Sequence, residues 1–300
     1  MAIGYGPVCG FNSLLSTALL LFWAGKEMIE MMDKAVILAR GLGTRMRKED
    51  QAAKLSASQA AIAETGVKAL IPVAGGTFLD YVLAALADAG YKSVCLVIGP
   101  EHVETREYYT HLKTSRIKIS FAVQEKPLGT ADAVAAAEQF TGSDPFLVIN
   151  SDNYYPPVAL KDLRAIAGPG LAGFEKQAML AGSNIPADRI AKFAIVQADG
   201  EGNMVRVIEK PSPQVLAGMS EPIFISMNCW RFDKSIYQAC RNIKPSARNE
   251  LELPDAVQYT IDELGQKYAV VSVQAPVLDL SSRGDVEAVA DRLKGMEINL

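Results

Sequence analysis

The chain lacks the sequence patterns of several common classes of protein. Its four cysteines are scattered and include no Cys-x-x-Cys pair, which argues against a disulfide framework and against a structural zinc site. This cysteine usage favours a reduced, cytoplasmic environment. The P-loop pattern Gly-x-x-x-x-Gly-Lys-Ser/Thr is also absent, which excludes one large class of nucleotide-binding protein.

An excess of positive charge is missing too. The chain has 30 Lys and Arg against 34 Asp and Glu, for a net charge of -4 and an isoelectric point near 5.4. A nucleic-acid-binding domain usually carries a basic surface, so we expect no nucleic-acid partner. The two histidines, His102 and His111, fall in a polar stretch that favours helix, and we expect both at the surface and not as metal ligands.

No apolar run is long enough to cross a membrane. Residues 14–24 are nearly all apolar, but a spanning helix needs roughly 20 such residues. No basic residue precedes the run, as a signal peptide would require, so we expect no membrane partner. Residues 1–32 are predicted to be an N-terminal extension, either upstream of a natural start at Met31 or Met32 or a helix packed on the domain. Residues 33–300 are predicted to form one domain.

Apolar runs and helical stretches alternate along the first half of that domain. Residues 35–39, 93–99 and 117–123 are rich in β-forming residues without polar alternation, which is typical of strands buried on both faces. Residues 78–89 and 101–112 favour helices between them. The pattern predicts an α/β fold with a mostly parallel central sheet. Shorter strands in the second half predict a smaller lobe.

A glycine-rich loop follows the first predicted strand. Gly41 and Gly43 stand one residue apart, and glycine lets a backbone turn sharply and bring its N–H groups close to an anion. Arg45 follows with a guanidinium group suited to phosphate oxygens. Met46 stands where the dinucleotide-binding motif has its third glycine. The loop therefore predicts either phosphate binding or a plain turn.

The stretch L-A-R-G-L-G-T-R-M resembles the signature of the sugar-1-phosphate nucleotidylyltransferases. Further motifs follow in the family's order over residues 33–294. The resemblance implies a Rossmann-like, nucleotide-diphospho-sugar transferase fold, with residues 33–300 as the catalytic domain. It also implies a catalytic role for Arg45. The nucleotide-binding residues that it implies in this stretch are Leu38, Ala39, Gly41, Gly43 and Thr44.

Lys68, which precedes an apolar run and Pro-Val, resembles the catalytic lysine of the family's second motif. It follows Arg45 at a longer interval than in relatives, which predicts an insertion over residues 48–66. The composition of residues 48–65 favours helix but offers few large apolar side chains. Such a helix could be a mobile lid that closes over bound phosphates, or an inert surface helix.

The next motif implies recognition of the nucleobase. Gln124, Gly129 and Thr130 resemble the family's Q…G-T-A-x-A stretch. The amide of Gln124 offers a donor and an acceptor, which suits uracil or thymine, so we expect UTP or dTTP. Residues 129–133 also resemble the adenylyl-transferring branch of the family, which makes ATP the main competitor.

Two aspartates match the family's metal ligands. Asp152 ends a buried strand, with Ser151 in place of the usual glycine. Asp279 matches the second ligand, although Ser281 departs from the usual Gly-Thr. Carboxylate oxygens are the ligands that Mg²⁺ prefers, so the resemblance implies a magnesium cofactor.

The sugar is expected to bind through residues of the second half. Glu209 and Lys210 form the family's E-K-P triplet, in which glutamate holds sugar hydroxyls and lysine the sugar phosphate. Asn228 occupies a position that faces the sugar in relatives. The implied partners are a nucleoside triphosphate and a sugar-1-phosphate, and homo-oligomerisation is left open.

The implied reaction is transfer of a nucleotidyl group from the triphosphate to the sugar-1-phosphate. One alternative is a non-catalytic, nucleotide-sugar-binding regulatory protein on the same fold, which the departures at Arg40, Ser151 and Ser281 keep open. A dinucleotide-dependent oxidoreductase is disfavoured because the third glycine is missing and no acidic residue ends a second strand about 20 residues further on.

Overall fold

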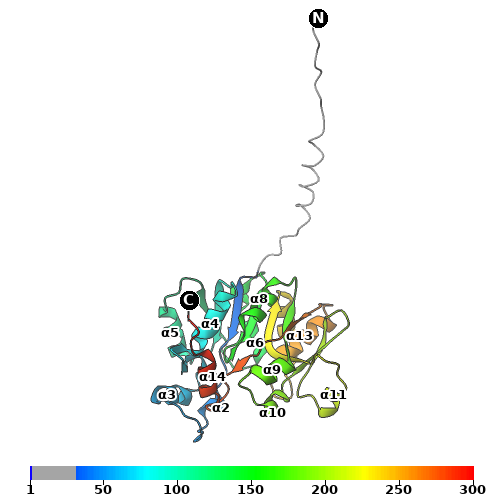
Figure 1. Cartoon of the computed structure of the whole chain (residues 1–300). Helices are drawn as coiled ribbons and strands as arrows, with labels where there is room; N and C mark the ends of the chain where they lie inside the picture. The colour runs from blue at the N-terminus through cyan, green and yellow to red at the C-terminus, as the bar shows by residue number, and fades with distance from the viewer. Residues whose placement is uncertain (2–31) are drawn as a thin grey trace. The chain divides into compact units, whose positions relative to one another are not determined.

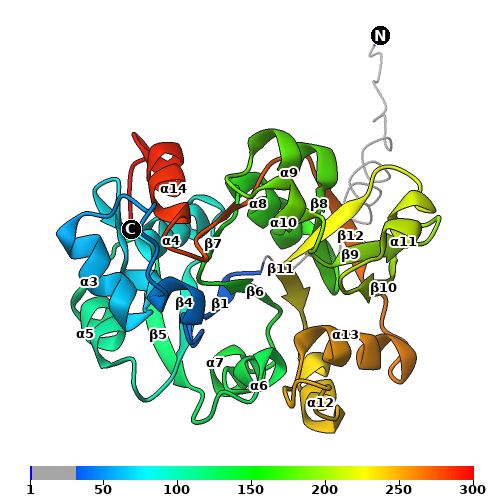
Figure 2. The ribbon, with the colours of Figure 1, turned by 90° about the horizontal axis from the view of Figure 1, so that it is seen from below.

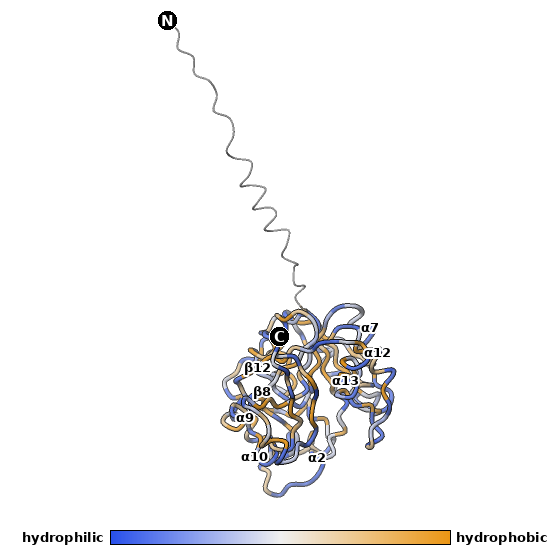
Figure 3. The backbone as a smooth tube through the Cα atoms, turned by 90° about the vertical axis from the view of Figure 1, so that its right-hand side faces the viewer, coloured by the Kyte–Doolittle hydropathy of each residue, from blue (hydrophilic) through white to orange (hydrophobic). Residues whose placement is uncertain are grey.

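The computed structural model describes Met1 and residues 32–300 (Figure 1). The expectation for the N-terminal extension therefore lies, apart from its two end residues, outside the described part of the chain. Within the described part, no helix is both long and apolar enough to span a bilayer. Apolar stretches gather in the interior of the domain, whereas the peripheral loops are hydrophilic (Figure 3).

Four parallel strands form the centre of the main sheet. Strand β1 (Lys34–Leu38) pairs with β4 (Ser93–Ile98) on one side and with β6 (Phe146–Asn150) on the other, and β4 pairs with β5 (Lys118–Val123). All these pairs are parallel, so the predicted parallel sheet is confirmed. Strands β1, β4 and β6 are buried on both faces, as their apolar runs predict, whereas the edge strand β5 is only partly buried.

Helices cover both faces of this sheet. Helix α4 (Phe78–Asp88) packs with Ile37 in one apolar core, and helix α6 (Thr130–Ala135) packs with Val36 in the other. Consecutive strand residues point to opposite faces, so β1 contributes to both cores. Figure 2 shows α6 beside two later helices that belong to the same core. The other long helices are α5 (Val103–His111), α8 (Pro157–Ala165), α12 (Ser235–Asn242), α13 (Leu253–Asp262) and α14 (Asp285–Leu293).

The second half of the chain extends the sheet with shorter strands. Strand β11 (Phe224–Phe232) pairs antiparallel with β6, with β8 (Gly170–Glu175) and with β9 (Ile195–Ala198). Beyond these, β12 (Ala269–Val273) lies parallel to β8, and β10 (Met204–Ile208) lies antiparallel to β9. The predicted lobe is thus a continuation of the central sheet.

The remaining elements connect those already described, and all but one nine-residue helix are short. They are α2 (Thr44–Arg47), α3 (Ala57–Thr65), η1 (Lys68–Leu70), β2 (Pro72–Val73), β3 (Gly76–Thr77), α7 (Glu138–Thr141), β7 (Asn153–Tyr154), α9 (Lys176–Gly182), α10 (Ala187–Ile190), α11 (Pro213–Ala217) and β13 (Leu278–Asp279).

The helix predicted over residues 48–65 is shorter in the structure. It begins only after Ser56, whose hydroxyl and backbone N–H form a reciprocal capping box with Gln59, and it ends at Gly66. The capping box sets this start, because it satisfies two backbone donors at the first turn. Gln59 Nε2 also donates to the Pro72 carbonyl at 2.8 Å, and Arg47 Nε donates to the Thr65 carbonyl at 3.0 Å. These contacts favour a packed surface helix over a mobile lid.

We expect the backbone amides of α3 to exchange slowly with solvent both without ligand and with UTP and Mg²⁺. Its cap and its bonds to neighbouring loops hold it in either state, and buried Ala63 anchors it. Hydrogen-exchange mass spectrometry measures this, with the buried helix α4 as the internal reference. A large ligand-induced gain of protection in α3 would restore the lid hypothesis.

Candidate functional site

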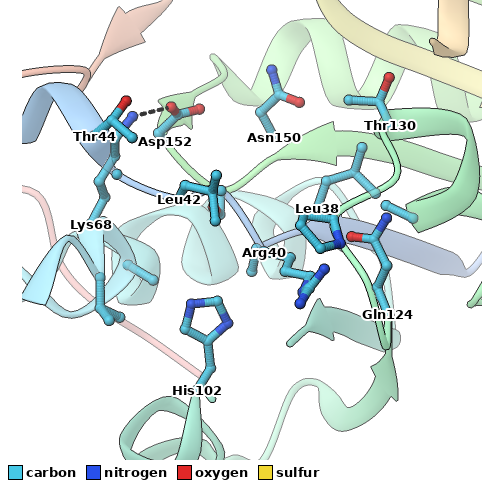
Figure 4. Close-up of a pocket in the computed structure, with 18 of the residues that line it drawn as sticks. Leu38, Arg40, Leu42, Thr44, Lys68, His102, Gln124, Thr130, Asn150 and Asp152 are labelled. Atoms are coloured by element: carbon cyan, nitrogen blue, oxygen red, sulfur yellow. Dashed lines mark hydrogen bonds and ion pairs between the residues drawn. The ribbon is translucent and has the colours of Figure 1, made fainter. Parts of the chain in front are cut away.

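A cavity of about 430 Å³ opens where the central parallel strands end. Parallel strands present their carboxyl ends at one edge of a sheet, and ligands of α/β proteins bind at that edge. The loop after β1 supplies one wall, and residues that follow β4, β5 and β6 supply others (Figure 4). The predicted site residues that line the cavity are Leu38, Ala39, Gly41, Gly43, Thr44, Arg45, Lys68, Gln124, Gly129, Thr130, Asp152 and Asn228.

The two glycines of the loop after β1 differ in what their surroundings require. Gly43 adopts φ +60°, and a Cβ built on it would lie 2.1 Å from the Gly66 carbonyl oxygen. Only glycine therefore fits at Gly43, where the loop packs on the end of α3. Gly41 has no atom within 4 Å of such a Cβ. Its missing side chain leaves open space in the cavity, as an approaching ligand would need.

Lys68 and Asp152 come together in the cavity although they are far apart in sequence. Lys68 Nζ lies 2.7 Å from Asp152 Oδ2, and the two side chains are 15% and 29% exposed (Figure 4). Lys68 lies in η1, and Asp152 follows β6. The Ser151 backbone N–H donates to the Leu38 carbonyl at 3.2 Å, which ties the loop after β6 to the end of β1. A cation and a carboxylate thus face the space beside the glycine loop.

Gln124 presents an acceptor and no free donor. Its side chain is buried, and Nε2 donates both to the Gly129 carbonyl at 2.9 Å and to Asp132 Oδ2 at 2.7 Å. Both partners are acceptors, so the network assigns the amide orientation and uses both N–H groups. The expectation that Gln124 offers a donor and an acceptor is therefore corrected: Oε1 is the group left for a ligand.

A second loop docks on the Gly129 turn and completes this end of the cavity. Gly129 has φ +121°, and a Cβ there would lie 2.4 Å from the Leu251 carbonyl oxygen. The Leu253 backbone N–H donates to Thr130 Oγ1 at 2.9 Å. The docked loop brings Glu250 into the lining. No sequence motif indicated this residue, because its position depends on contact between distant segments.

His102, which we expected at the surface, is partly exposed and lines the cavity. It lies at the start of α5, and its Nδ1 accepts a hydrogen bond of 3.0 Å from the Gly99 backbone N–H. The proton of the neutral ring is then on Nε2. Burial lowers the pKa of His102 below its ordinary value, and Glu101 opposes this shift. A neutral imidazole therefore adds no charge to the site at pH 7. His111 is exposed, as expected.

The predicted sugar-binding residues divide into two groups. Asn228 lines the cavity and adopts φ +53° where the pairing of β11 with β8 shifts register. Such strained backbone is often kept at binding sites. Glu209 and Lys210 follow β10 and are not part of the lining. Burial, reinforced by the charge of Glu252, raises the pKa of Glu209 above its ordinary value.

Asp279 is not part of the cavity lining, and its role as a metal ligand stays a prediction. Strand β13 pairs with β7, so Asp279 lies beside Asn153, the residue that follows Asp152 in the sequence. Its side chain is 8% exposed, is ion-paired with Arg189, and accepts a 2.9 Å hydrogen bond from Asn153 Nδ2. Arg189 engages Asp285 as well, at 3.0 Å. Among the described residues, no three His, Cys, Asp or Glu side chains form a metal-binding cluster.

The two glycines predict opposite mutational outcomes. Gly43→Ala should lower the free energy of unfolding by about 1–3 kcal/mol or more, because its Cβ meets the Gly66 backbone at a left-handed φ. Gly41→Ala, at a residue without positive φ, should change stability by no more than about 0.5 kcal/mol and weaken triphosphate binding. Urea unfolding and calorimetric titration measure the two effects. Equal destabilisation by both variants would contradict this division.

Comparison with known proteins gives relatives of consistent type. The family model described as "Nucleotidyl transferase" matches residues 34–275. A glucose-1-phosphate thymidylyltransferase of Streptomyces griseus is 30% identical over 76% of this chain and 57% of its own length. The low-salt glycan biosynthesis nucleotidyltransferase Agl11 of Haloferax volcanii is 30% identical over 77% of this chain and 57% of its own length.

The chain thus spans less than two thirds of the length of these relatives. A crystal structure of UDP-glucose pyrophosphorylase complexed with UDP-glucose has the same fold, with a TM-score of 0.67, 18% identity, and coverage of 87% of this chain and 98% of that one. The family model covers most of the domain, including the cavity and its glycine loop. The chain belongs to the nucleotidyl transferase family.

Proposed function

We propose that this protein transfers a nucleotidyl group from a nucleoside triphosphate to a sugar-1-phosphate. A phosphate oxygen of the sugar-1-phosphate attacks the α-phosphorus, the bond from that phosphorus to the bridging oxygen breaks, and pyrophosphate leaves. The observation that carries the proposal is the Lys68–Asp152 pair at 2.7 Å beside the glycine loop. Family membership and the name of the Streptomyces relative support the same chemistry.

The charges of the cavity suit this reaction, because two anions must be brought together. Such phosphoryl transfer depends mainly on positioning and charge neutralisation. Arg45, with the backbone amides around Gly41 and Gly43, holds the leaving phosphates. Lys68 stabilises charge on the α-phosphate. The nucleophile is already an anion, so the neutral His102 is not needed as a general base.

The sugar-1-phosphate enters from the side of the extended sheet. Asn228 reaches the cavity from β11 and contacts the sugar. Glu209 and Lys210 bind its hydroxyls and its phosphate from the end of β10. The loop that carries Glu250 into the lining also carries Glu252, whose charge acts on Glu209. The charge of this loop therefore acts on the E-K-P turn.

A magnesium ion fits the donor set with Asp152 as its protein ligand. Mg²⁺ keeps several waters and is usually bound by one or two carboxylates together with substrate phosphates. The lack of a three-residue acidic or histidine cluster in the described part of the chain is compatible with such a site. When bound, Mg²⁺ would neutralise phosphate charge and orient the triphosphate. Lys68 already holds the Asp152 carboxylate in place.

The favoured triphosphate is UTP or dTTP. Oε1 of Gln124 can accept the N3–H of uracil or thymine, and the name of the Streptomyces relative specifies thymidylyl transfer. Adenine offers only its exocyclic amine to the same acceptor, so ATP remains the competing substrate.

The ion pair between Asp279 and Arg189 favours a second candidate function. A nucleotide-sugar-binding protein without catalysis would keep the cavity while the second carboxylate serves the fold.

A substrate panel tests the proposal. Purified protein with Mg²⁺ is given each of ATP, CTP, GTP, UTP and dTTP against several sugar-1-phosphates, and pyrophosphate release is measured. We expect release with UTP or dTTP at a kcat/KM at least about tenfold above the other triphosphates. Release with none of them, together with calorimetric binding of a nucleotide-sugar, would support the non-catalytic alternative. A preference for a purine triphosphate would contradict the assignment of the base.

Asp152→Asn should lower kcat by about 100-fold or more, or roughly 2.7 kcal/mol, because it removes the charge that holds Mg²⁺. Thermal unfolding should change little, and Asp162→Asn on the exposed side of α8 is the matched control. Asp279→Asn should lower the free energy of unfolding by about 1–3 kcal/mol, because it weakens the buried pair with Arg189. Wild-type turnover by Asp152→Asn, or wild-type turnover in excess chelator, would refute the metal assignment.

A further inference from the structure

Arg40 carries hydrogen-bond donors that the folded protein leaves unused. It directly follows Ala39 in the cavity wall, and its side chain is 8% exposed. Nη2 pairs with Glu101 at 3.3 Å and donates to the Glu125 carbonyl at 3.3 Å. Nε and Nη1 are buried without a hydrogen-bond partner.

The surroundings of Arg40 hold the guanidinium in this position without satisfying it. A Cβ at Gly99 would lie 2.5 Å from Arg40 Nε, so the missing side chain of Gly99 makes the space that Arg40 occupies. His102 lines the cavity, and because its Nδ1 accepts from the Gly99 N–H, the neutral ring carries its proton on Nε2 and offers Arg40 no acceptor. A buried donor without an acceptor is energetically unfavourable. An acceptor that enters the cavity would remove this cost.

The position of Arg40 points to the base and not to the phosphates. Its Nη2 bonds to the carbonyl of Glu125, the residue next to Gln124. Figure 4 shows Arg40 between His102 and Gln124, whereas Lys68 and Asp152 lie on the other side of the cavity beside Thr44. Arg40 thus belongs to the end of the cavity where Gln124 is bound to the Gly129 turn.

Gln124 and Arg40 are complementary to one class of nucleobase. Gln124 offers only an acceptor, because both amide hydrogens are used. A base with a ring N–H beside a carbonyl, such as uracil or thymine, needs an acceptor for the N–H and a donor for the oxygen. We propose that Arg40 is the specificity-determining residue that donates to this carbonyl oxygen. The inference rests on the proposed function and assigns one residue of its nucleotide site.

Thio analogues of UTP isolate this contact. Replacing O2 or O4 by sulfur keeps the ring N–H and weakens the acceptor at one position. Arg40→Met should weaken calorimetric binding of UTP about tenfold or more, as expected for loss of a hydrogen bond to a charged donor. With one of the two analogues, 2-thio-UTP or 4-thio-UTP, Arg40→Met should weaken binding by at most about a third of the factor seen with UTP. The analogue that loses the effect identifies the carbonyl.

Inorganic tripolyphosphate separates a base contact from a phosphate contact. It carries the charges of the triphosphate without a base, so Arg40→Met should leave its binding unchanged. Weaker tripolyphosphate binding, or an equal loss of affinity for UTP and both thio analogues, would overturn the proposal. These measurements use binding and not turnover, so they decide the role of Arg40 even if no pyrophosphate is released and the proposed reaction fails.

Two further variants control for effects on folding. Arg231 is also buried with an unpartnered Nε, but its Nη1 donates to the Arg164 carbonyl at 3.1 Å and it does not line the cavity. Arg231→Met should lower thermal stability without changing the ratio of UTP to thio-UTP affinity. Arg40→Lys keeps the charge beside Glu101 but loses the fixed guanidinium. It should therefore retain tripolyphosphate binding but lose the preference for UTP over the thio analogue. If Arg40→Met does not fold, a ratio of UTP to thio-UTP affinity in Arg40→Lys equal to that of the wild type refutes the proposal.

Discussion

The parallel pairing of β1 between β4 and β6 is the constraint on which the site depends. Val36 and Ile37 are fully buried on opposite faces of β1, so the strand cannot slip by one residue without exchanging two apolar cores. With this register held, the strands end at a common edge. The loops after them, which carry Arg40, His102 and Asp152, must then converge.

Close backbone contacts hold those loops in place. Gly43 of the glycine loop packs against the Gly66 backbone, and Gly129 packs against the Leu251 backbone. Both contacts lie closer than any side chain allows, so each turn has one position relative to its neighbour. This rigidity suits the proposed reaction between two phosphates, which would depend on where fixed charges stand and not on a titrating group.

Electrostatics divides the cavity into two ends. At one end Lys68 and Asp152 form an ion pair at 2.7 Å, so this end carries charges of both signs that nearly cancel. At the other end Asp132 binds the amide of Gln124 and orients its carbonyl oxygen into the site. Arg40 is buried there beside a half-exposed Glu101. The two ends of the cavity therefore offer different environments to the base and to the phosphates of the proposed substrate.

Much of this arrangement follows from local sequence. Unbroken apolar runs predict parallel strands, and glycines and charged residues after those runs predict polar loops at one edge. The resemblance to the family then indicated the cavity residues Leu38, Ala39, Gly41, Gly43, Thr44, Arg45 and Asp152. Side-chain partners could not be predicted. Asp279 is engaged by Arg189, which lies 90 residues away, and Glu250 reaches the cavity only because its loop docks on Gly129.

The sequence by itself determined the strand pattern and the types of group available, because burial preference and backbone freedom are properties of each residue and its near neighbours. Only the tertiary structure decided which cation pairs with each carboxylate, that the amide of Gln124 keeps only its acceptor, and which histidine lines the cavity. Those outcomes depend on hydrogen bonds and ion pairs between segments that meet only when the sheet is complete.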